Sequence, residues 1–543
     1  MVPMHMRRLP KACSLLRLPT LNVAKALSTQ PLSCARAPLA HRTPPLHVLQ
    51  SARAQPIREL LPYADFGVSP ITAAATNATD AAAATTATAT TSATAATAAT
   101  AATATASDAA STLPAASLAS SEHELVSEMT KHVRNGAEEP FFMIDLGAAY
   151  ARVALWRAHL PRVEPFYAVK CNPDLALLSL FASLGVNFDC ASRAEMQAVF
   201  SVGVEPERVV YANPCKQPSH LRFAKENGVQ LSVFDSEAEL VKTAAAHPSC
   251  ELLLRIKVDD SKAQCVMSDK YGAPLSQAAS LLAAAAKHDV RVRGVSFHVG
   301  SGCYSPTAFV DAITRAAHVF EMAADRGTPM DILDIGGGFP GSDTPELAFS
   351  DIAAAIRPAL DAHFPESRKV RFIAEPGRFL AAKTHTLAVN IIGKKTAVDA
   401  NGKRHTMYYV NDGLYGSFNN VVYDHAVPEF KVLPEVGTGD TCNGSDGTCR
   451  TAAKPPLESC SIWGPTCDGF DCIVKSTRLP DLEVGRWLYF PEMGAYTSAA
   501  GSTFNGMPQP DKHFFARAAA DAFAVNAAAF DEASEPRAMA ACA

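Results

Sequence analysis

The chain has 543 residues, of which 48% are hydrophobic and 19% charged, and its formal net charge is −5. This composition suits a large apolar core and more than one domain, and the mild charge argues against a nucleic-acid partner. No apolar run reaches the roughly 18–20 residues that a membrane span requires, so no membrane insertion is expected. The 14 cysteines include no C-x-x-C pair, which favours free thiols in a reducing compartment over disulfides or a metal site.

The first 120 residues differ from the rest of the chain. Residues 1–58 contain no Asp or Glu but several Arg and Ser residues, a composition typical of a mitochondrial or plastid transit peptide. A basic extension on a cytoplasmic protein explains it equally well. Residues 72–110 are almost entirely Ala and Thr, which predicts a disordered spacer. We therefore expect residues 1–120 to be a disordered leader on a protein of the cytoplasm or an organelle, not a secreted one.

From residue 121 onward, short apolar runs alternate with amphipathic stretches. The strand-like runs are 141–144, 165–169, 186–188, 209–211, 231–234, 252–256, 292–297, 332–335 and 370–374. The helical stretches between them are 175–184, 194–202, 236–246, 275–287, 308–324 and 348–364. This alternation predicts a β/α barrel of the TIM type over residues 121–379, with an open doubly wound sheet as the alternative.

After Phe379 the helical pattern stops. Strand-like runs follow at 385–392, 406–410, 429–432, 471–475 and 487–490. They predict a separate antiparallel β-domain over residues 380–543. Residues 435–458 are rich in Gly, Thr, Asp and Lys, which is typical of an exposed insertion.

One stretch places a single amine at the end of a strand-like run. The run 165–169 leads directly to Lys170, and Asn172-Pro173 then stops both the strand and any immediate helix. A lysine buried among apolar neighbours loses its charge readily, and a neutral amine condenses with aldehydes. On this stretch alone, an ordinary lysine whose ammonium reaches solvent is the alternative.

Two further turns carry groups suited to a phosphate and to a ring nitrogen. Residues 336–338 are three glycines after a strand-like run; they let the backbone approach a phosphate, although a tight turn explains them too. The next run ends at Glu375-Pro376-Gly377-Arg378. Arg378 suits a phosphate and Glu375 a cationic ring nitrogen, and a structural ion pair between them is the alternative.

Other strand ends add an imidazole at His298, a hydroxyl at Ser301, an acid at Asp189 and a cation at Arg255. Because the carboxyl ends of barrel strands meet at one rim, we expect these groups to converge on Lys170. An amine, a phosphate cradle, an acid and a flat imidazole at one rim describe a pyridoxal phosphate site.

Several spaced motifs occur together in the chain. In order they are Phe-Tyr-Ala-Val-Lys-Cys-Asn, Phe-Asp-Cys-Ala-Ser, Ser-Phe-His-Val-Gly-Ser-Gly, Asp-Ile-Gly-Gly-Gly-Phe-Pro-Gly, Glu-Pro-Gly-Arg, Tyr-Asp-His, Gly-Pro-Thr-Cys-Asp and Gly-Ala-Tyr. This set resembles the eukaryotic ornithine decarboxylases, which are pyridoxal phosphate enzymes of the alanine-racemase-like fold. The similarity runs from about residue 141 to residue 508.

The resemblance implies a role for each matching position at the cofactor. Lys170 would bind the cofactor aldehyde covalently, His298 would stack on the ring, and Glu375 would keep the pyridine nitrogen protonated. The phosphate would be held by Ser301, Gly338, Arg378 and Tyr496, and Gly336 and Gly337 would also contact the cofactor. The remaining cofactor contacts would come from Asp189, Arg255, Pro376 and Gly377.

The resemblance also implies a homodimer with shared active sites. Cys467 and Asp468 would enter from the partner chain, and the Cys467 thiol would protonate the α-carbon after CO2 leaves. Tyr423, Asp424 and Asp468 would bind L-ornithine, the two carboxylates meeting its distal ammonium. Two acids there argue against diaminopimelate, whereas lysine, one methylene longer, is hard to reject.

The implied reaction converts L-ornithine to putrescine and CO2, the first step of polyamine biosynthesis. A lysine/ornithine decarboxylase of broader specificity is one alternative, and a non-catalytic regulator resembling antizyme inhibitor is another. Regulators of that kind have lost cofactor contacts, whereas Asp189, Arg255 and Arg378 match the active pattern here. Residues 216–247 resemble the antizyme-binding region of animal relatives, so an antizyme-like inhibitor is a candidate partner, although Lys216 and its basic neighbours also suit a solvated face.

Overall fold

The computed structural model describes residues 115–398, 400–434 and 455–515. The expected transit peptide, the Ala/Thr spacer and most of the expected insertion at 435–458 lie outside these ranges. Within them, no helix combines the length and the apolar character needed to cross a membrane.

Eight parallel strands close into a barrel in the order β10-β11-β2-β3-β4-β5-β6-β8. Their bounds are β2 (Val163–Ala168), β3 (Asn187–Cys190), β4 (Val209–Tyr211), β5 (Leu231–Phe234), β6 (Glu251–Arg255), β8 (Val292–Ser296), β10 (Ile332–Asp334) and β11 (Arg371–Ala374). Alternate residues of these strands, such as Phe166, Val210, Leu253 and Ile373, fill the interior with apolar side chains. The predicted barrel is confirmed, and the open sheet is excluded.

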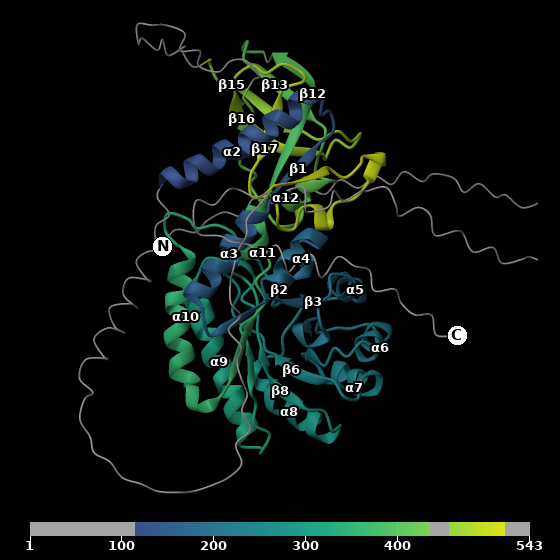
Figure 1. Ribbon diagram of the computed structural model, residues 1–543, viewed down its shortest axis with the longest axis vertical. Helices are drawn as coiled ribbons and strands as arrows, with labels where there is room; N and C mark the ends of the chain where they lie inside the picture. Colours follow the sequence, from purple (N-terminus) through teal and green to yellow (C-terminus); the bar gives the residue numbers. More distant parts are fainter. Residues whose placement is uncertain (1–114, 399, 435–454, 516–543) are drawn as a thin grey trace, which may run out of the picture. The chain divides into compact units, whose positions relative to one another are not determined.

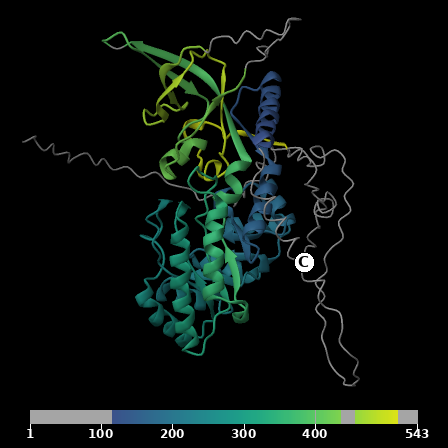
Figure 2. The same ribbon diagram turned by 90° about the vertical axis from the view of Figure 1, so that its left-hand side faces the viewer.

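Helices cover the outside of the barrel strands, as α8, α9 and α10 show in two views (Figure 1, Figure 2). Their bounds are α3 (Leu146–His159), α4 (Leu175–Ser183), α5 (Arg193–Ser201), α6 (Pro218–Glu226), α7 (Glu237–Ala246), α8 (Leu275–Lys287), α9 (Pro306–Ala324) and α10 (Phe349–His363). The sequence analysis did not single out α6. Only Leu221 and Ala224 of this helix are buried, so its apolar signal is short.

A second sheet has eight strands, six of them in the order β14-β17-β12-β13-β15-β16. The bounds are β1 (Phe141–Asp145), β12 (His385–Val398), β13 (Arg404–Val410), β14 (Lys431–Val432), β15 (Glu458–Trp463), β16 (Cys472–Leu479), β17 (Trp487–Phe490) and β18 (Asp511–Phe515). Most pairs are antiparallel, as predicted, but β13 pairs with β15 and β1 with β18 in parallel. The predicted β-domain is present.

Strand β1 departs from the expected order of the chain. The sequence places it with the barrel strands, but it pairs with β12 and β18 of the second sheet. All five of its residues are buried, so no polar alternation marks it as part of an antiparallel sheet. The β-domain is therefore assembled from segments on both sides of the barrel sequence.

Four short or peripheral elements complete the described chain. They are α2 (Ala115–Arg134), α11 (Arg378–Ala381), α12 (Asn420–Tyr423) and the two-stranded sheet of β7 (Ala263–Cys265) and β9 (Ser301–Cys303). The expectation that helices stop at Phe379 fails for α11 and α12, which are too short to show a periodic pattern.

Candidate active site

Lys170 lies in a single 3-10 turn directly after β2, as the abrupt end of the apolar run suggests. The turn is fixed from its far side: the Asn172 amide donates to the Gly494 carbonyl at 2.9 Å, and Asp174 accepts from Ala176 N–H at 3.0 Å as the N-cap of α4. The Lys170 ammonium forms an ion pair with Asp189. Asp189 lies on β3, where it pairs with Ala168 of β2. Adjacent strand ends thus bring the amine and the acid together.

The charge state of Lys170 differs from the sequence expectation. Burial lowers the pKa of its ammonium, but the carboxylates of Asp189 and Glu375 raise it more, so the net shift of the pKa is upward. Apolar surroundings were expected to neutralise the amine. In the chain without its cofactor this expectation is wrong, because a buried acid lies beside the ammonium. The amine must pass a proton to another group before it can react with an aldehyde.

Three buried carboxyl groups gather at this rim. Asp334 ends β10 and Glu375 follows β11, and both join Asp189. Burial raises the pKa of Glu375 well above its usual value, and the charges of Asp334 and Asp189 raise it further. Burial likewise raises the pKa of Asp334 to about 7.

These acids outnumber their cations. Lys170 and Arg255 are the cations that act on Glu375, whereas three carboxyl groups face them. Asp189 Oδ1 and Asp334 Oδ2 are buried and have no hydrogen-bond partner among the described residues. A further cationic N–H would balance this cluster, and a protonated ring nitrogen supplies one.

The glycine run after β10 is packed too tightly for side chains. A Cβ on Gly337 would lie 2.7 Å from His298 Nε2 and 2.8 Å from the Glu375 carbonyl oxygen. Gly338 has a φ of 112°, and its Cβ would lie 2.7 Å from the Gly300 carbonyl oxygen. Only glycine allows the backbone to pass here, which keeps main-chain groups open to a ligand.

Arg378, at the start of α11, has an incomplete set of hydrogen bonds. Its Nη1 and Nη2 donate to the two oxygens of Asp424, each at 2.6 Å, and Nη2 also donates to Ser301 Oγ at 2.8 Å. Its guanidinium lies 5.0 Å from the centre of the Tyr496 ring. The buried Nε–H has no partner, so this edge of the guanidinium is available to an anion.

His298 is held as a neutral ring. Burial lowers the pKa of its imidazole well below the usual value, and the charges of Arg255 and Lys170 lower it further. Its Nδ1 accepts the Gly300 N–H at 3.0 Å. A neutral, oriented imidazole suits stacking on a flat ring.

Cys467, Asp468 and Tyr423 lie elsewhere. The Tyr423 side chain is exposed, and Cys467 is also exposed. Cys467 N–H donates to Asn505 Oδ1 at 2.9 Å, and Asp468 accepts from the Tyr415 hydroxyl, so the recorded contacts of both lie within the β-domain. The structure brings Asp424 to Arg378 but does not bring these three residues to Lys170.

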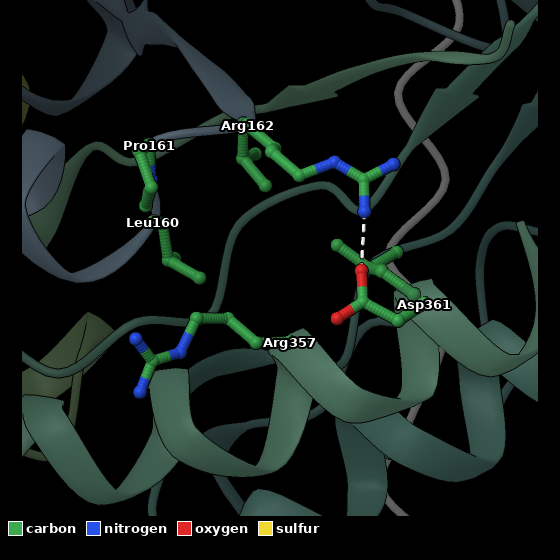
Figure 3. A pocket seen from close by; sticks show the side chains of 7 residues that line it. Leu160, Pro161, Arg162, Arg357 and Asp361 are labelled. Carbon is green, nitrogen blue, oxygen red and sulfur yellow. Dashed lines mark hydrogen bonds and ion pairs between the residues drawn. The ribbon is translucent and has the colours of Figure 1, made fainter. Parts of the chain in front are cut away.

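A small pocket at the opposite end of the barrel lies apart from this site (Figure 3). It is lined by Leu160, Pro161, Arg162, Val163, Arg357, Leu360 and Asp361. Val163 begins β2, whereas Lys170 follows the end of that strand. Arg162 and Asp361 form an ion pair at this pocket, and its lining residues include none of the rim acids.

Sequence reasoning missed three residues of the site. Asp334 directly precedes the glycine run and is a polar residue at a strand end, which is a usable signal. Gln264 and Cys265 contact Asp424 from β7. A three-residue strand has no pattern that could have revealed them.

A closed β/α barrel with a lysine, paired acids and a glycine cradle at its rim defines a barrel enzyme that binds pyridoxal phosphate. Comparison with known proteins agrees: the family described as "Pyridoxal-dependent decarboxylase, pyridoxal binding domain" matches residues 146–382. The chain is 49% identical over 386 residues to ornithine decarboxylase of Rattus norvegicus, covering 69% of this chain and 80% of that protein.

Two further relatives widen this picture. Antizyme inhibitor 2 of Xenopus laevis is 46% identical over 399 residues, covering 72% of this chain and 84% of that protein. The crystal structure of the Paramecium bursaria Chlorella virus arginine decarboxylase superposes with a TM-score of 0.66 at 35% identity, covering 72% of this chain and all of that one. The chain belongs to the family of pyridoxal-dependent decarboxylases, and its cofactor is pyridoxal phosphate.

The described residues fit this cofactor. The free Nε–H of Arg378 suits a phosphate oxygen, and the surplus of buried carboxyl groups suits a protonated pyridine nitrogen. The glycine run has no room for side chains, so its backbone N–H groups are the groups that it can offer to a phosphate.

Proposed function

We propose that this chain decarboxylates L-ornithine to putrescine and CO2, the reaction that begins polyamine biosynthesis. The observation that carries the substrate assignment is Asp424, a buried carboxylate held beside the candidate phosphate ligands Arg378 and Ser301. A buried acid beside the phosphate ligands, in addition to the acids near Lys170, suits a substrate with a second, distal ammonium. The identity to rat ornithine decarboxylase supports the same reaction.

The pyridoxal ring, when bound, supplies a sink for the electrons left on the α-carbon. The chain's own groups prepare that chemistry. Glu375 would accept the ring N–H, which restores its charged form despite the burial that raises its pKa. His298 is neutral and so adds no positive charge against the ring face. Lys170 would contribute the amine, with Asp189 as its ion-pair partner when it carries a proton.

We also propose that the active form is a homodimer in which the partner subunit completes each site. Cys467 and Asp468 are not brought to Lys170 within one chain, although a thiol is a suitable acid for protonating carbon. Exposure of Cys467 and Tyr423 is consistent with a surface that a second copy covers.

The non-catalytic alternative deserves weight because antizyme inhibitor 2 of the frog is similar. The ion pair of Lys170 with Asp189 and the buried Glu375 favour the enzyme, since a regulator has no need to bury charge at a cofactor site. Binding of an antizyme-like inhibitor remains a proposal for α6 and α7. Lys216 is fully buried and ion-paired with Glu239 at 3.0 Å, so it is not part of a solvated basic face.

The test is decarboxylation by the purified full-length chain with added pyridoxal phosphate. L-Ornithine, L-lysine, L-arginine and diaminopimelate are compared by kcat/KM for CO2 release. Ornithine is expected to lead, with lysine behind by about 10- to 200-fold, because one methylene is worth ~1–3 kcal/mol. A preference for any of the other three substrates, or no release from any of them, contradicts the assignment.

A further inference from the structure

Asp424 is held by a second set of contacts besides Arg378. Cys265 on β7 donates its thiol to Asp424 Oδ1 at 3.2 Å, and the Gln264 side-chain amide donates to the Asp424 backbone carbonyl. Burial and the neighbouring Asp424 raise the pKa of the Cys265 thiol to about 11. The thiol therefore keeps its proton and acts as a donor over the neutral pH range.

Counting acceptor sites shows what this contact does. A carboxylate oxygen accepts about two hydrogen bonds. Asp424 Oδ1 accepts from Arg378 Nη2 and from the Cys265 thiol, so it is filled, whereas among the described residues Arg378 Nη1 alone donates to Oδ2. One acceptor position is thus left on a chosen oxygen, Oδ2.

Strand β7 is itself fixed to the candidate phosphate site. It pairs antiparallel with β9, and Cys265 lies opposite Ser301. The approach is close: a Cβ on Gly300 would lie 2.3 Å from Ala263 Cβ, and one on Gly302 would lie 2.9 Å from Gln264 Oε1. Ser301 in turn accepts from Arg378. The strand, the arginine and Asp424 therefore form one connected unit.

We propose that Cys265 and Gln264 are positioning residues that orient Asp424, so that Oδ2 faces the distal ammonium of the substrate. This inference rests on the proposed function, because it assigns to Asp424 the recognition of that ammonium. Neither residue touches the reacting atoms. Replacing them should therefore change the binding of the distal ammonium and no other part of the substrate. The charge of Asp424 itself is balanced by Arg378.

The experiment measures how much the distal ammonium contributes to binding. Putrescine and 1-aminobutane, which differ in that group, are titrated into the holoenzyme by isothermal titration calorimetry. The proteins are the wild type, Cys265→Ala, Cys265→Ser and, as a control for thiol loss, Cys215→Ala, whose thiol is exposed. Thermal unfolding of each variant confirms that the fold persists.

Cys265→Ala is expected to weaken putrescine binding by about threefold to tenfold, the usual range for a hydrogen bond to a charged group reduced for a weak thiol donor. Binding of 1-aminobutane should stay within about twofold in the same variant, and Cys265→Ser should retain putrescine affinity because its hydroxyl also donates. Cys215→Ala should match the wild type.

Three results would overturn the inference: equal weakening of both amines, no weakening of either, or a Cys265→Ser variant as impaired as Cys265→Ala. Failure of the proposed function is a different result. It is a wild type that binds both amines equally and releases no CO2 from ornithine, whichever residue occupies position 265.

Discussion

The barrel rim and the β-domain loops hold their functional groups in opposite ways. At the rim, Lys170 and Asp189 form an ion pair within one chain, and the acids Asp189 and Glu375 are buried. In the β-domain loops, Cys467 and Asp468 are exposed and bond only to their own surroundings.

The difference follows from the cost of burying charge. A buried carboxylate without a partner costs several kcal/mol. At the rim this cost is reduced by the Lys170–Asp189 ion pair and by the raised pKa values of Glu375 and Asp334. An exposed thiol and acid carry no such cost and need no fixed partner. The candidate cofactor residues are therefore gathered within one chain, and the proposed homodimer is what would bring Cys467 and Asp468 to them.

Replacing Lys170 tests the rim most severely. Lys170→Ala should lower kcat by about 10³-fold or more, because it removes the amine that would bond the cofactor aldehyde. Lys170→Arg keeps a cation beside Asp189 but cannot form that bond, and it should be nearly as inactive. CO2 release and the absorbance of bound cofactor are the measurements, and full activity in either variant would refute the role of this residue.

Removing the charge of Glu375 tests the acid cluster. Glu375→Gln keeps the shape of the side chain but cannot hold a protonated ring nitrogen, so kcat should fall by about 10²-fold. Glu492→Gln is the matched control, because Glu492 is exposed and lies on the surface. Steady-state kinetics decide the matter: an unchanged kcat for Glu375→Gln would mean that the cluster has only a structural role.

The contact between the barrel and the β-domain at His385 should make the stability of the fold sensitive to acid. His385 begins β12 and is fully buried, with its Nε2 at 3.2 Å from the Asn172 amide nitrogen and its Nδ1 at 2.6 Å from Thr384 Oγ1. Burial lowers the pKa of its imidazole to about 3. The unfolded chain therefore binds a proton at this residue below about pH 6.5, while the folded chain does not.

His385 therefore does not reduce the free energy of unfolding above pH 6.5. As the pH falls from 6.5 towards 3, protonation of His385 in the unfolded chain lowers that free energy progressively. The free energy of unfolding should drop by about 2 kcal/mol from this group between pH 7 and pH 5. His385→Gln should show a drop smaller by that amount in urea unfolding at the two pH values. Equal drops in both proteins would place the acid sensitivity elsewhere.

The rim could be predicted from the sequence because its signals are local. Lys170, the glycine run and Glu375 each directly follow a strand-like run, and barrel geometry brings strand ends together. The protonated state of Lys170 was missed, because it depends on Asp189 and Glu375, which lie on other strands.

Contacts between distant segments left no local signal. β1 pairs with β12 and β18, hundreds of residues further along the chain, and its uniform burial resembles that of a barrel strand. The bond from Cys265 to Asp424 joins a three-residue strand to a loop of the β-domain. Patterns within a short window describe neither pairing.

Mixing inactive subunits tests whether the rim and the β-domain loop of one site come from different chains. Lys170→Ala removes a rim residue and Cys467→Ala a loop residue, and each variant alone should be nearly inactive. If each site takes its rim from one chain and its loop from the other, a mixed dimer contains one intact site and one with both defects. Random exchange makes about half of the dimers mixed, so about a quarter of wild-type activity should return.

The control is a mixture of Lys170→Ala with Glu375→Gln. Both defects lie in the rim, so every site keeps a damaged rim and no activity should return. No recovery in the first mixture, once exchange is shown by mass, would mean that one chain supplies both halves of its own site. Recovery in the control would mean instead that Lys170 and Glu375 of one site come from different chains.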